Sequence, residues 1–238
     1  MKIIYSLLIL LGLISHSLKA DPVKIPSSPR VDKILQSVDK PLRQELAEKN
    51  FQYGSQVFIR MFKTPSILEI WLKKGDKFAL FKRYPICTFS GDLGPKTKEG
   101  DYQAPEGFYS VQPASLNPYS QYHISFNLGY PNLFDRQNGR TGSALMVHGK
   151  CVSIGCYAMG DNYIEEIYAL IVMAFKQGQK NIEVNIFPFA LEDEYLDAMK
   201  DEKWYSFWKD LQPGYHYFNQ HKKPPKVSVK NKRYVIAK

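Results

Sequence analysis

The chain has 238 residues, 44% of them apolar, and a formal net charge of +9 at pH 7. This composition excludes a disordered protein, and the length allows one large domain or a domain with embellishments. No basic helix or aromatic RNA-binding motif is visible, so we predict no nucleic-acid partner. Dispersed lysines and arginines that solvate the surface explain the charge, and anionic wall polymer or membrane headgroups are the alternative partners.

The first twenty residues have the features of a secretory signal peptide. Lys2 precedes an apolar run from Ile3 to Ile14, and the small residue Ala20 suits a cleavage site. A membrane anchor is the alternative, but the apolar run is short for a span. Cleavage removes two lysines and no acidic residue, which lowers the net charge from +9 to +7. We therefore predict an exported, periplasmic protein that begins near Asp21 and keeps no stable membrane span.

The mature chain begins with helical patterns and continues with strands. Residues 21–30 hold three prolines and predict a leader with little regular structure. Residues 31–50 have helical spacing, and we expect Pro41 to begin a second short helix. From residue 56 the pattern becomes that of strands, with a hairpin turn at residues 74–76. The expected strands are "QVFIRMF", "ILEIWLKKGDKFALFKRYPI", "GFYSV", "YHISFNL" and "SALMV".

Two long loops and one well-defined helix follow in the pattern. Residues 91–107 and 129–142 are rich in Gly, Pro and charge, and loops of this length often shape a binding cleft. Residues 161–179 have helical periodicity, with Asp161 expected as the N-cap. The strand "IEVNIFPF" comes next, and an aromatic-rich tail of helical pieces ends the chain. The order predicts an α+β fold with a mainly β core and flanking helices.

Three cysteines are too few for a disulfide scaffold and odd in number. In an oxidising compartment at least one of them stays unpaired within the chain, and a free exported thiol is at risk of oxidation. We predict that Cys151 is a core residue or forms a disulfide with Cys87. The segment around Cys156 favours a functional thiol instead.

That segment, "ALMVHGKCVSIGCYAMGD", holds the groups that a cysteine nucleophile needs. His148 lies eight residues before Cys156, and Gly155 permits a tight turn that presents the Cys156 amide. Zinc bound by His148, Cys151 and Cys156 is an alternative, but the spacing lacks a paired knuckle and a clear fourth ligand. Thiolate, imidazole and backbone donors suffice for amide exchange, so we predict no metal and no organic cofactor.

The "HG" and "SIGCYAM" segments resemble the His-Gly…Ser-x-Gly-Cys signature of the L,D-transpeptidase (YkuD-type) catalytic domain family. The resemblance extends to "GPKTKEGDYQAPEGFYSV", "SFNLGYPNLFDRQNGRTGSALMVHG" and "NIEVNIFPF", which are similar to its YafK-like branch. It implies a β-sandwich or barrel with flanking helices. The domain organisation expected from it is a signal peptide (1–20), a leader with helices (21–50), a catalytic domain (51–190) and an aromatic-rich helical extension packed on it (191–238).

The resemblance also implies roles for individual residues. Cys156 matches the nucleophile and His148 the general base, and the Gly149 carbonyl would orient the imidazole. Ser153 would position the thiol or border the oxyanion site, and Gly155 and Cys156 would supply backbone donors.

Four further residues are predicted to bind substrate. Arg136 and Arg140 can pair with stem-peptide carboxylates, although solvated surface arginines are the alternative. Tyr130 and Tyr157 are the other two. The chain departs from many family members by carrying Ile154 in place of a second histidine and Ala158 in place of Arg or Asn.

The YafK-like branch implies hydrolysis of the diaminopimelate–lysine amide that joins peptidoglycan to an outer-membrane lipoprotein. Stem peptides and wall-linked lipoprotein would then be the partners, and a Cys acyl-enzyme the intermediate. An L,D-transpeptidase that forms cross-links or exchanges D-amino acids, or an L,D-carboxypeptidase, is the alternative within the same chemistry. A non-catalytic wall-binding module is the alternative from another class.

Overall fold

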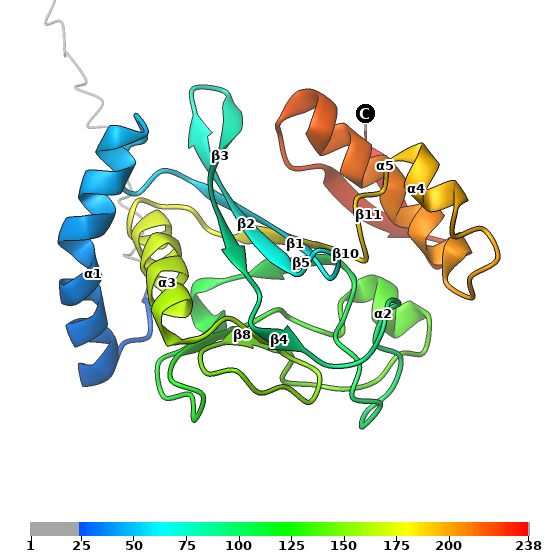
Figure 1. Cartoon of the computed structure of the whole chain (residues 1–238), viewed down its shortest axis with the longest axis horizontal. Helices are drawn as coiled ribbons and strands as arrows, with labels where there is room; N and C mark the ends of the chain where they lie inside the picture. The colour runs from blue at the N-terminus through cyan, green and yellow to red at the C-terminus, as the bar shows by residue number, and fades with distance from the viewer. Residues whose placement is uncertain (1–23, 238) are drawn as a thin grey trace, which may run out of the picture.

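A computed structural model describes residues 24–237, so the predicted signal peptide lies outside the described residues. The helices are α1 (Pro29–Glu48), η1 (Pro113–Ser115, a 3-10 turn), α2 (Leu133–Gln137), α3 (Asp161–Lys176), α4 (Asp193–Asp197) and α5 (Tyr205–His221) (Figure 1). The strands are β1 (Val57–Phe62), β2 (Ile67–Lys74), β3 (Lys77–Pro85), β4 (Thr88–Phe89), β5 (Gly107–Val111), β6 (Leu116–Asn117), β7 (Ser125–Asn127), β8 (Met146–His148), β9 (Tyr157–Ala158), β10 (Ile182–Phe187), β11 (Lys226–Lys230) and β12 (Arg233–Ala237). Between residues 24 and 237, no helix has the length and apolarity needed to cross a membrane.

The larger sheet has the strand order β3-β2-β1-β10-β5, with β1 parallel to β10 and the other pairs antiparallel. All six residues of β1 are buried, because both faces of this sheet are covered. Ile59 and Met61 face the main core, whereas Phe58 and Phe62 pack on the other side. Figure 1 shows α1 and α3 on one side of the sheet and α5 on the other.

A second sheet of short strands, in the order β4-β9-β8-β7-β6, lies below the first in Figure 1. Side chains from both sheets and from α3 share one core, as Ile59, Val147 and Ile167 illustrate. The predicted mainly β core with flanking helices is therefore confirmed. The two sheets remain separate, so the expected closed-barrel form is not adopted.

Helix α1 differs from its prediction, because it continues through Pro41 instead of ending there. Its buried residues, Val31, Ile34, Leu42 and Leu46, fall on both sides of the proline and hold the two halves against the core. Burial of one continuous apolar stripe therefore outweighs the loss of one backbone hydrogen bond.

Helix α3 also differs at its start. Its N-cap is Gly160, and Asp161 is the first helical residue. The Asp161 carboxylate accepts a hydrogen bond from the backbone N–H of Lys150 at 2.7 Å. The expected capping role is thus replaced by a contact to the segment that carries His148.

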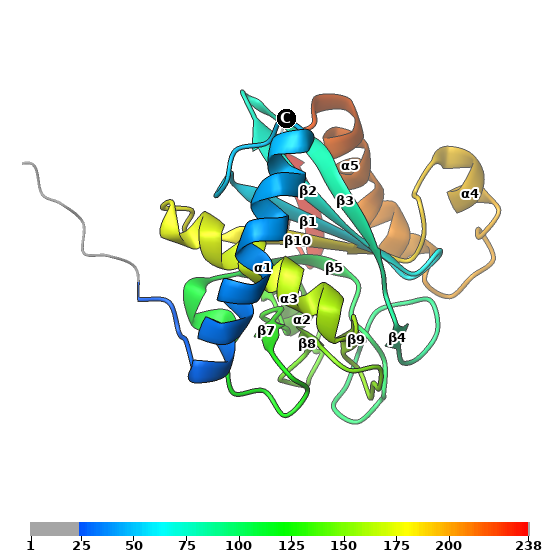
Figure 2. The same ribbon diagram turned by 60° about the vertical axis from the view of Figure 1, so that its left-hand side comes forward.

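The tail contains α4 and α5 (Figure 2), as the pattern predicted, and also a hairpin of β11 and β12 that it did not predict. Tyr234 of the hairpin stacks on Phe134 with ring centroids 4.1 Å apart and meets Phe108 edge-on at 4.9 Å. The aromatic residues of the tail thus pack against the central sheet and α2.

A buried ion pair anchors the long loop 91–107. Lys63, which follows β1, has a side chain with no solvent exposure and lies 3.1 Å from the equally buried Glu106. Its ammonium also donates to the backbone carbonyls of Asp92, Gly94 and Ala104 at 2.7–2.9 Å. Three carbonyls and one carboxylate thereby replace the water that burial removes from the charge.

Lys63→Met should lower the free energy of unfolding by about 3–5 kcal/mol, because it leaves the Glu106 carboxylate buried without a cation. Urea denaturation followed by tryptophan fluorescence measures the change. Lys63→Met/Glu106→Gln should recover part of the loss, since the uncompensated charge is gone. Lys200→Met, at an exposed lysine, serves as the control and should stay within about 0.5 kcal/mol of the wild type. An equally small effect of Lys63→Met would contradict the anchoring role.

Candidate active site

The register of β8 and β9 brings His148 and Cys156 to one face of the second sheet. These strands are parallel, with Val147 paired to Tyr157 and His148 paired to Ala158. Cys156 therefore lies beside Met146, and its sulfur is 3.4 Å from the Met146 backbone nitrogen. Met146 and His148 are two residues apart on β8, so their side chains share a face. Because Cys156 lies beside Met146, its side chain points to the same face as that of His148.

Both side chains line a cavity of about 390 Å³. Ser153 and Gly155 line it as well, and so do residues of the 91–107 loop. The loop residues are Lys96, Glu99, Gly100 and Tyr102. The structure thus brings together the predicted thiol, the predicted base and the two residues of the turn between them.

The imidazole of His148 is held by one hydrogen bond. Its Nδ1 lies 2.6 Å from the Gly149 carbonyl oxygen, which can only accept, so Nδ1 carries the proton and the Nε2 lone pair is left free. The side chain is buried, and burial lowers the pKa of His148 despite this hydrogen bond, which acts in the opposite direction. The Tyr122 ring packs on it with centroids 4.8 Å apart. His148 is therefore a neutral base near pH 7.

Gly149 is required by close packing. A Cβ at this position would lie 2.6 Å from the Asp161 carboxylate and 3.0 Å from the Tyr122 carbonyl oxygen. Its N–H donates to that same carbonyl at 3.0 Å. A larger residue would displace the carbonyl that orients His148.

The Cys156 thiol is the free cysteine of the described chain. Burial raises its pKa, and the Met146 N–H and the positive charge of Lys96 partly offset this. The thiol also donates a hydrogen bond to the Ala144 carbonyl oxygen at 3.7 Å. The resting state therefore pairs a neutral thiol with a neutral imidazole.

Ser153 and Gly155 shape the turn that ends at Cys156. Gly155 has φ +137°, a conformation that favours glycine. The Ser153 hydroxyl donates to the Cys156 carbonyl at 2.7 Å and accepts from the Gly155 N–H at 3.2 Å. The Gly155 N–H is thus engaged by Ser153 in this structure, and its use as an oxyanion donor stays a prediction.

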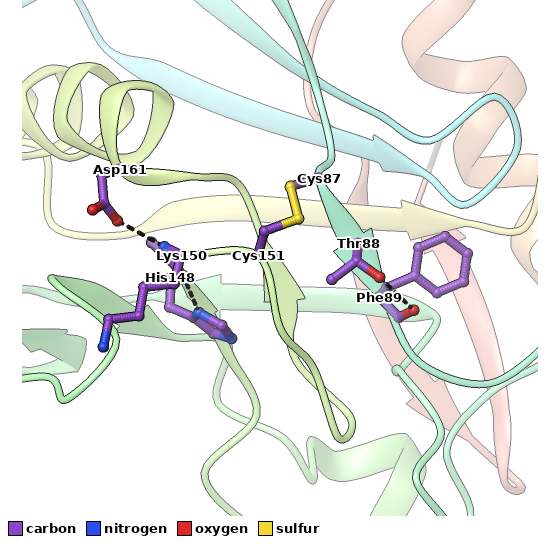
Figure 3. Close-up of a disulfide and its surroundings, with 8 residues drawn as sticks. Cys87, Thr88, Phe89, His148, Lys150, Cys151 and Asp161 are labelled. Carbon is purple, nitrogen blue, oxygen red and sulfur yellow. Dashed lines mark hydrogen bonds between the residues drawn. A yellow bond between two sulfur atoms is a disulfide. The ribbon is translucent and has the colours of Figure 1, made fainter.

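A disulfide joins Cys151 to Cys87, as one of the two sequence alternatives predicted (Figure 3). It ties the segment between His148 and Cys156 to the chain that connects β3 with β4. The Cys87 N–H also donates to the Ala158 carbonyl at 2.8 Å. Oxidised Cys151 offers no thiolate, so the alternative of a zinc site that includes it is removed.

The four predicted substrate-binding residues do not line this cavity. Tyr157 is fully buried, and its hydroxyl donates to the Pro105 carbonyl at 2.8 Å. Tyr130 is also buried, with its hydroxyl directed at the carbonyls of residues 96 and 141. Arg140 is held by Asp135 at 2.9 Å, and Arg136 lines a different cavity. Packing thus holds Tyr130 and Tyr157 and an internal ion pair holds Arg140, whereas Arg136 is exposed away from the Cys156 cavity.

Sequence reasoning missed the residues that do form the cavity wall. Lys96 is buried beside the cavity, and its ammonium lies 2.6 Å from the Asp101 carboxylate. Tyr102 and Tyr122 are large and exposed at the rim. The composition of the 91–107 loop indicated a cleft, but nothing in its sequence showed which side chains turn inward.

Replacing both Cys87 and Cys151 by alanine should lower the free energy of unfolding by about 4 kcal/mol, from the chain-entropy cost of a crosslink with a sequence separation of 64 residues. Thermal and urea unfolding measure the loss, with Cys156→Ser as a control that keeps the crosslink. Thiol titration of the unreduced, denatured protein should find one free thiol, and three would rule out the disulfide.

Comparison with known proteins places this site in a family. Residues 64–186 match the model described as the L,D-transpeptidase catalytic domain, YkuD. The Escherichia coli K12 protein named "Putative L,D-transpeptidase YafK" is 45% identical over 201 residues, which cover 84% of this chain and 79% of that protein. The protein of the same name from Escherichia coli O157:H7 is equally similar.

Among solved structures, the helical cell shape determining protein Pgp2 of Campylobacter jejuni aligns with a TM-score of 0.46 at 18% identity, over 84% of this chain and 80% of that one. The family match spans the β-rich region that holds the His148 and Cys156 cavity, and the identity to the Escherichia coli proteins extends over most of the chain. The chain therefore belongs to the L,D-transpeptidase catalytic-domain family.

Proposed function

We propose that the protein is a periplasmic cysteine amidase that hydrolyses the diaminopimelate–lysine link between peptidoglycan and outer-membrane lipoprotein. The observation that carries the chemistry is a free thiol and an oriented neutral imidazole on one face of β8 and β9, lining one cavity. The sequence resemblance to the YafK-like branch supplies the substrate class. The secretory features of residues 1–20 support export.

The reaction begins with proton transfer from the Cys156 thiol to Nε2 of His148 as the sulfur attacks the amide carbonyl of the diaminopimelate residue. The Cys156 backbone N–H stabilises the oxyanion that forms on the carbonyl oxygen. The C–N bond then breaks, and the imidazolium returns its proton to the departing lysine amine. The product of this half-reaction is a thioester on Cys156.

Water completes the hydrolysis. Neutral His148 takes a proton from the incoming water, the hydroxide adds to the thioester carbonyl, and the sulfur leaves as a thiolate that recovers the proton. An amine in place of water would give a new amide and make the protein a transferase. The name of the Escherichia coli relative favours this second candidate, and both reactions share the thioester.

The rim of the cavity bears on the choice between water and amine. Ile154 is 72% exposed and Val152 is 54% exposed, and both line the cavity. Neither side chain offers a hydrogen bond or a charge to the carboxylate of a D-amino acid or of a second stem peptide. This part of the rim provides little to hold a charged acceptor, and we therefore place hydrolysis first.

Lipoprotein-linked muropeptides incubated with the protein, with and without added D-amino acid, test the proposal. Mass spectrometry should show free tetrapeptide ends in both mixtures. Cys156→Ala and His148→Gln should each lower turnover by at least about a thousandfold. His221→Gln, at an exposed histidine of α5, should leave turnover unchanged.

If the main product carries amine-exchanged ends, the reaction is transfer and the assignment of hydrolysis is wrong. Unchanged turnover by Cys156→Ala would end the assignment of a cysteine mechanism. Binding of muropeptides without any turnover by the intact protein would favour a wall-binding module.

The rate of Cys156 alkylation by iodoacetamide should rise with pH, with a midpoint above the usual pKa of a thiol, because burial disfavours the thiolate. Lys96→Met should move the midpoint higher still, since it removes a nearby positive charge. Lys98→Met, at an exposed lysine of the same loop, is the matched control and should leave it in place. Rates are measured by mass spectrometry of the unreduced protein. A midpoint below the usual pKa of a thiol would instead reveal a preformed thiolate–imidazolium pair.

A further inference from the structure

A second cavity, of about 420 Å³, lies between the larger sheet, α2 and the C-terminal hairpin. Glu183 and Asn185 of β10 form part of its wall, and Val227 and Val229 of β11 form another part. It shares no lining residue with the Cys156 cavity. The chemistry described above makes no use of it.

The first sign of a ligand is an unsatisfied amide. Asn185 is 2% exposed, and its Nδ2 has no hydrogen-bond partner among the described residues. Buried polar atoms in folded proteins are nearly always paired, because an unmade hydrogen bond is costly. An Asn amide in a cavity wall that the fold leaves unpaired is suited to a ligand that completes its hydrogen bonds.

The second sign is the placement of Glu183. In the antiparallel pair of β10 and β5, Glu183 is opposite Ser110 and Asn185 is opposite Phe108. Glu183 and Asn185 are two residues apart, so they share a face at a spacing of about 7 Å. An exposed carboxylate that accepts hydrogen bonds therefore lies beside an amide that donates them.

One secondary amide fits between these two groups. Its N–H can donate to Glu183, and its carbonyl can accept from Asn185 once the Asn185 amide turns about χ2 and brings its enclosed Nδ2 into the cavity, each over about 2.9 Å. The methyl group of an acetamide would then meet the apolar side of the cavity, which Val227 and Val229 provide. Ser110, opposite Glu183 on β5, adds a hydroxyl group that matches a polyhydroxylated ring.

We propose that this cavity binds the acetamido group of an N-acetylated amino sugar in the wall glycan. The cavity wall carries one acidic and one basic side chain, Glu183 and Arg136, so the alternative amide source, a stem peptide with its carboxylates, is an outcome of the test. The inference rests on the proposed function for its substrate class. The same loop, 129–142, supplies Asn132 and Arg136 to this cavity and leads directly into Ser143 and Ala144 of the Cys156 cavity. A glycan held here would keep its peptide stems near the thiol.

Calorimetric titration of the Cys156→Ala protein with the tetrasaccharide of N-acetylglucosamine tests the site without turnover. We expect saturable binding that cellotetraose, which lacks the acetamido groups, does not reproduce. Asn185→Leu and Glu183→Ala should each weaken binding roughly fivefold to tenfold, the effect of one lost hydrogen bond. Glu202→Ala, at an exposed carboxylate outside the cavity, should bind normally.

Asn185→Leu should unfold at no lower temperature than the parent, because it removes an unpaired donor, so a loss of binding is not a loss of fold. Equal binding of both tetrasaccharides, no binding of either, or unchanged affinity in both variants would overturn the proposal. Binding of a free stem tetrapeptide in place of the sugar would also overturn it. Saturable sugar binding with no muropeptide turnover by the intact protein would instead refute the proposed function alone.

Discussion

The geometry of the candidate active site depends on the buried contact between Lys63 and Glu106. Removing two charges from water is costly, and the fold offsets this with three carbonyls around the ammonium and two donors, the Gly94 N–H and the Trp208 indole, on the carboxylate. The pair thereby joins the end of β1, the 91–107 loop and α5 at one point. Because that loop supplies Lys96 to the cavity wall, the cavity is shaped by a contact that no substrate touches.

Burial also determines the protonation states of Cys156 and His148. Burial raises the pKa of Cys156 and lowers that of His148, so both groups rest in their neutral forms. A neutral thiol is less open to oxidation than a thiolate, which protects the free cysteine of the described chain. In the proposed mechanism the thiol must therefore lose its proton as it attacks, so the position of Nε2 matters more than the basicity of the thiolate. The hydrogen bond from Nδ1 to Gly149 and the ring contact with Tyr122 fix that position.

Local features of the sequence predicted more of the site than of its surroundings. The thiol, the histidine and the glycines are close in the chain, and the positive φ of Gly155 is a local property. The contacts of Tyr157 and Arg140 depend on tertiary structure instead. Alternation along β9 turns Tyr157 away from the face that Cys156 occupies, and Asp135 holds Arg140 through a buried ion pair. Residue spacing in the sequence predicts neither the burial of Tyr157 nor the pairing of Arg140 with Asp135.

The C-terminal hairpin of β11 and β12 also depends on tertiary contacts that local sequence does not reveal, and it lines the second cavity. A two-stranded hairpin is marginal by itself, so β11 and β12 depend on packing against α5 and α2. That packing requires Gly214 inside α5, where a Cβ would lie 2.5 Å from the Phe108 ring and 3.3 Å from Ile236. A glycine within a helix therefore marks close approach to a partner that the helical pattern did not reveal. Because the docked hairpin supplies Val227, Val229 and Tyr234 to the second cavity, that cavity exists only when the tail is packed on the sheet.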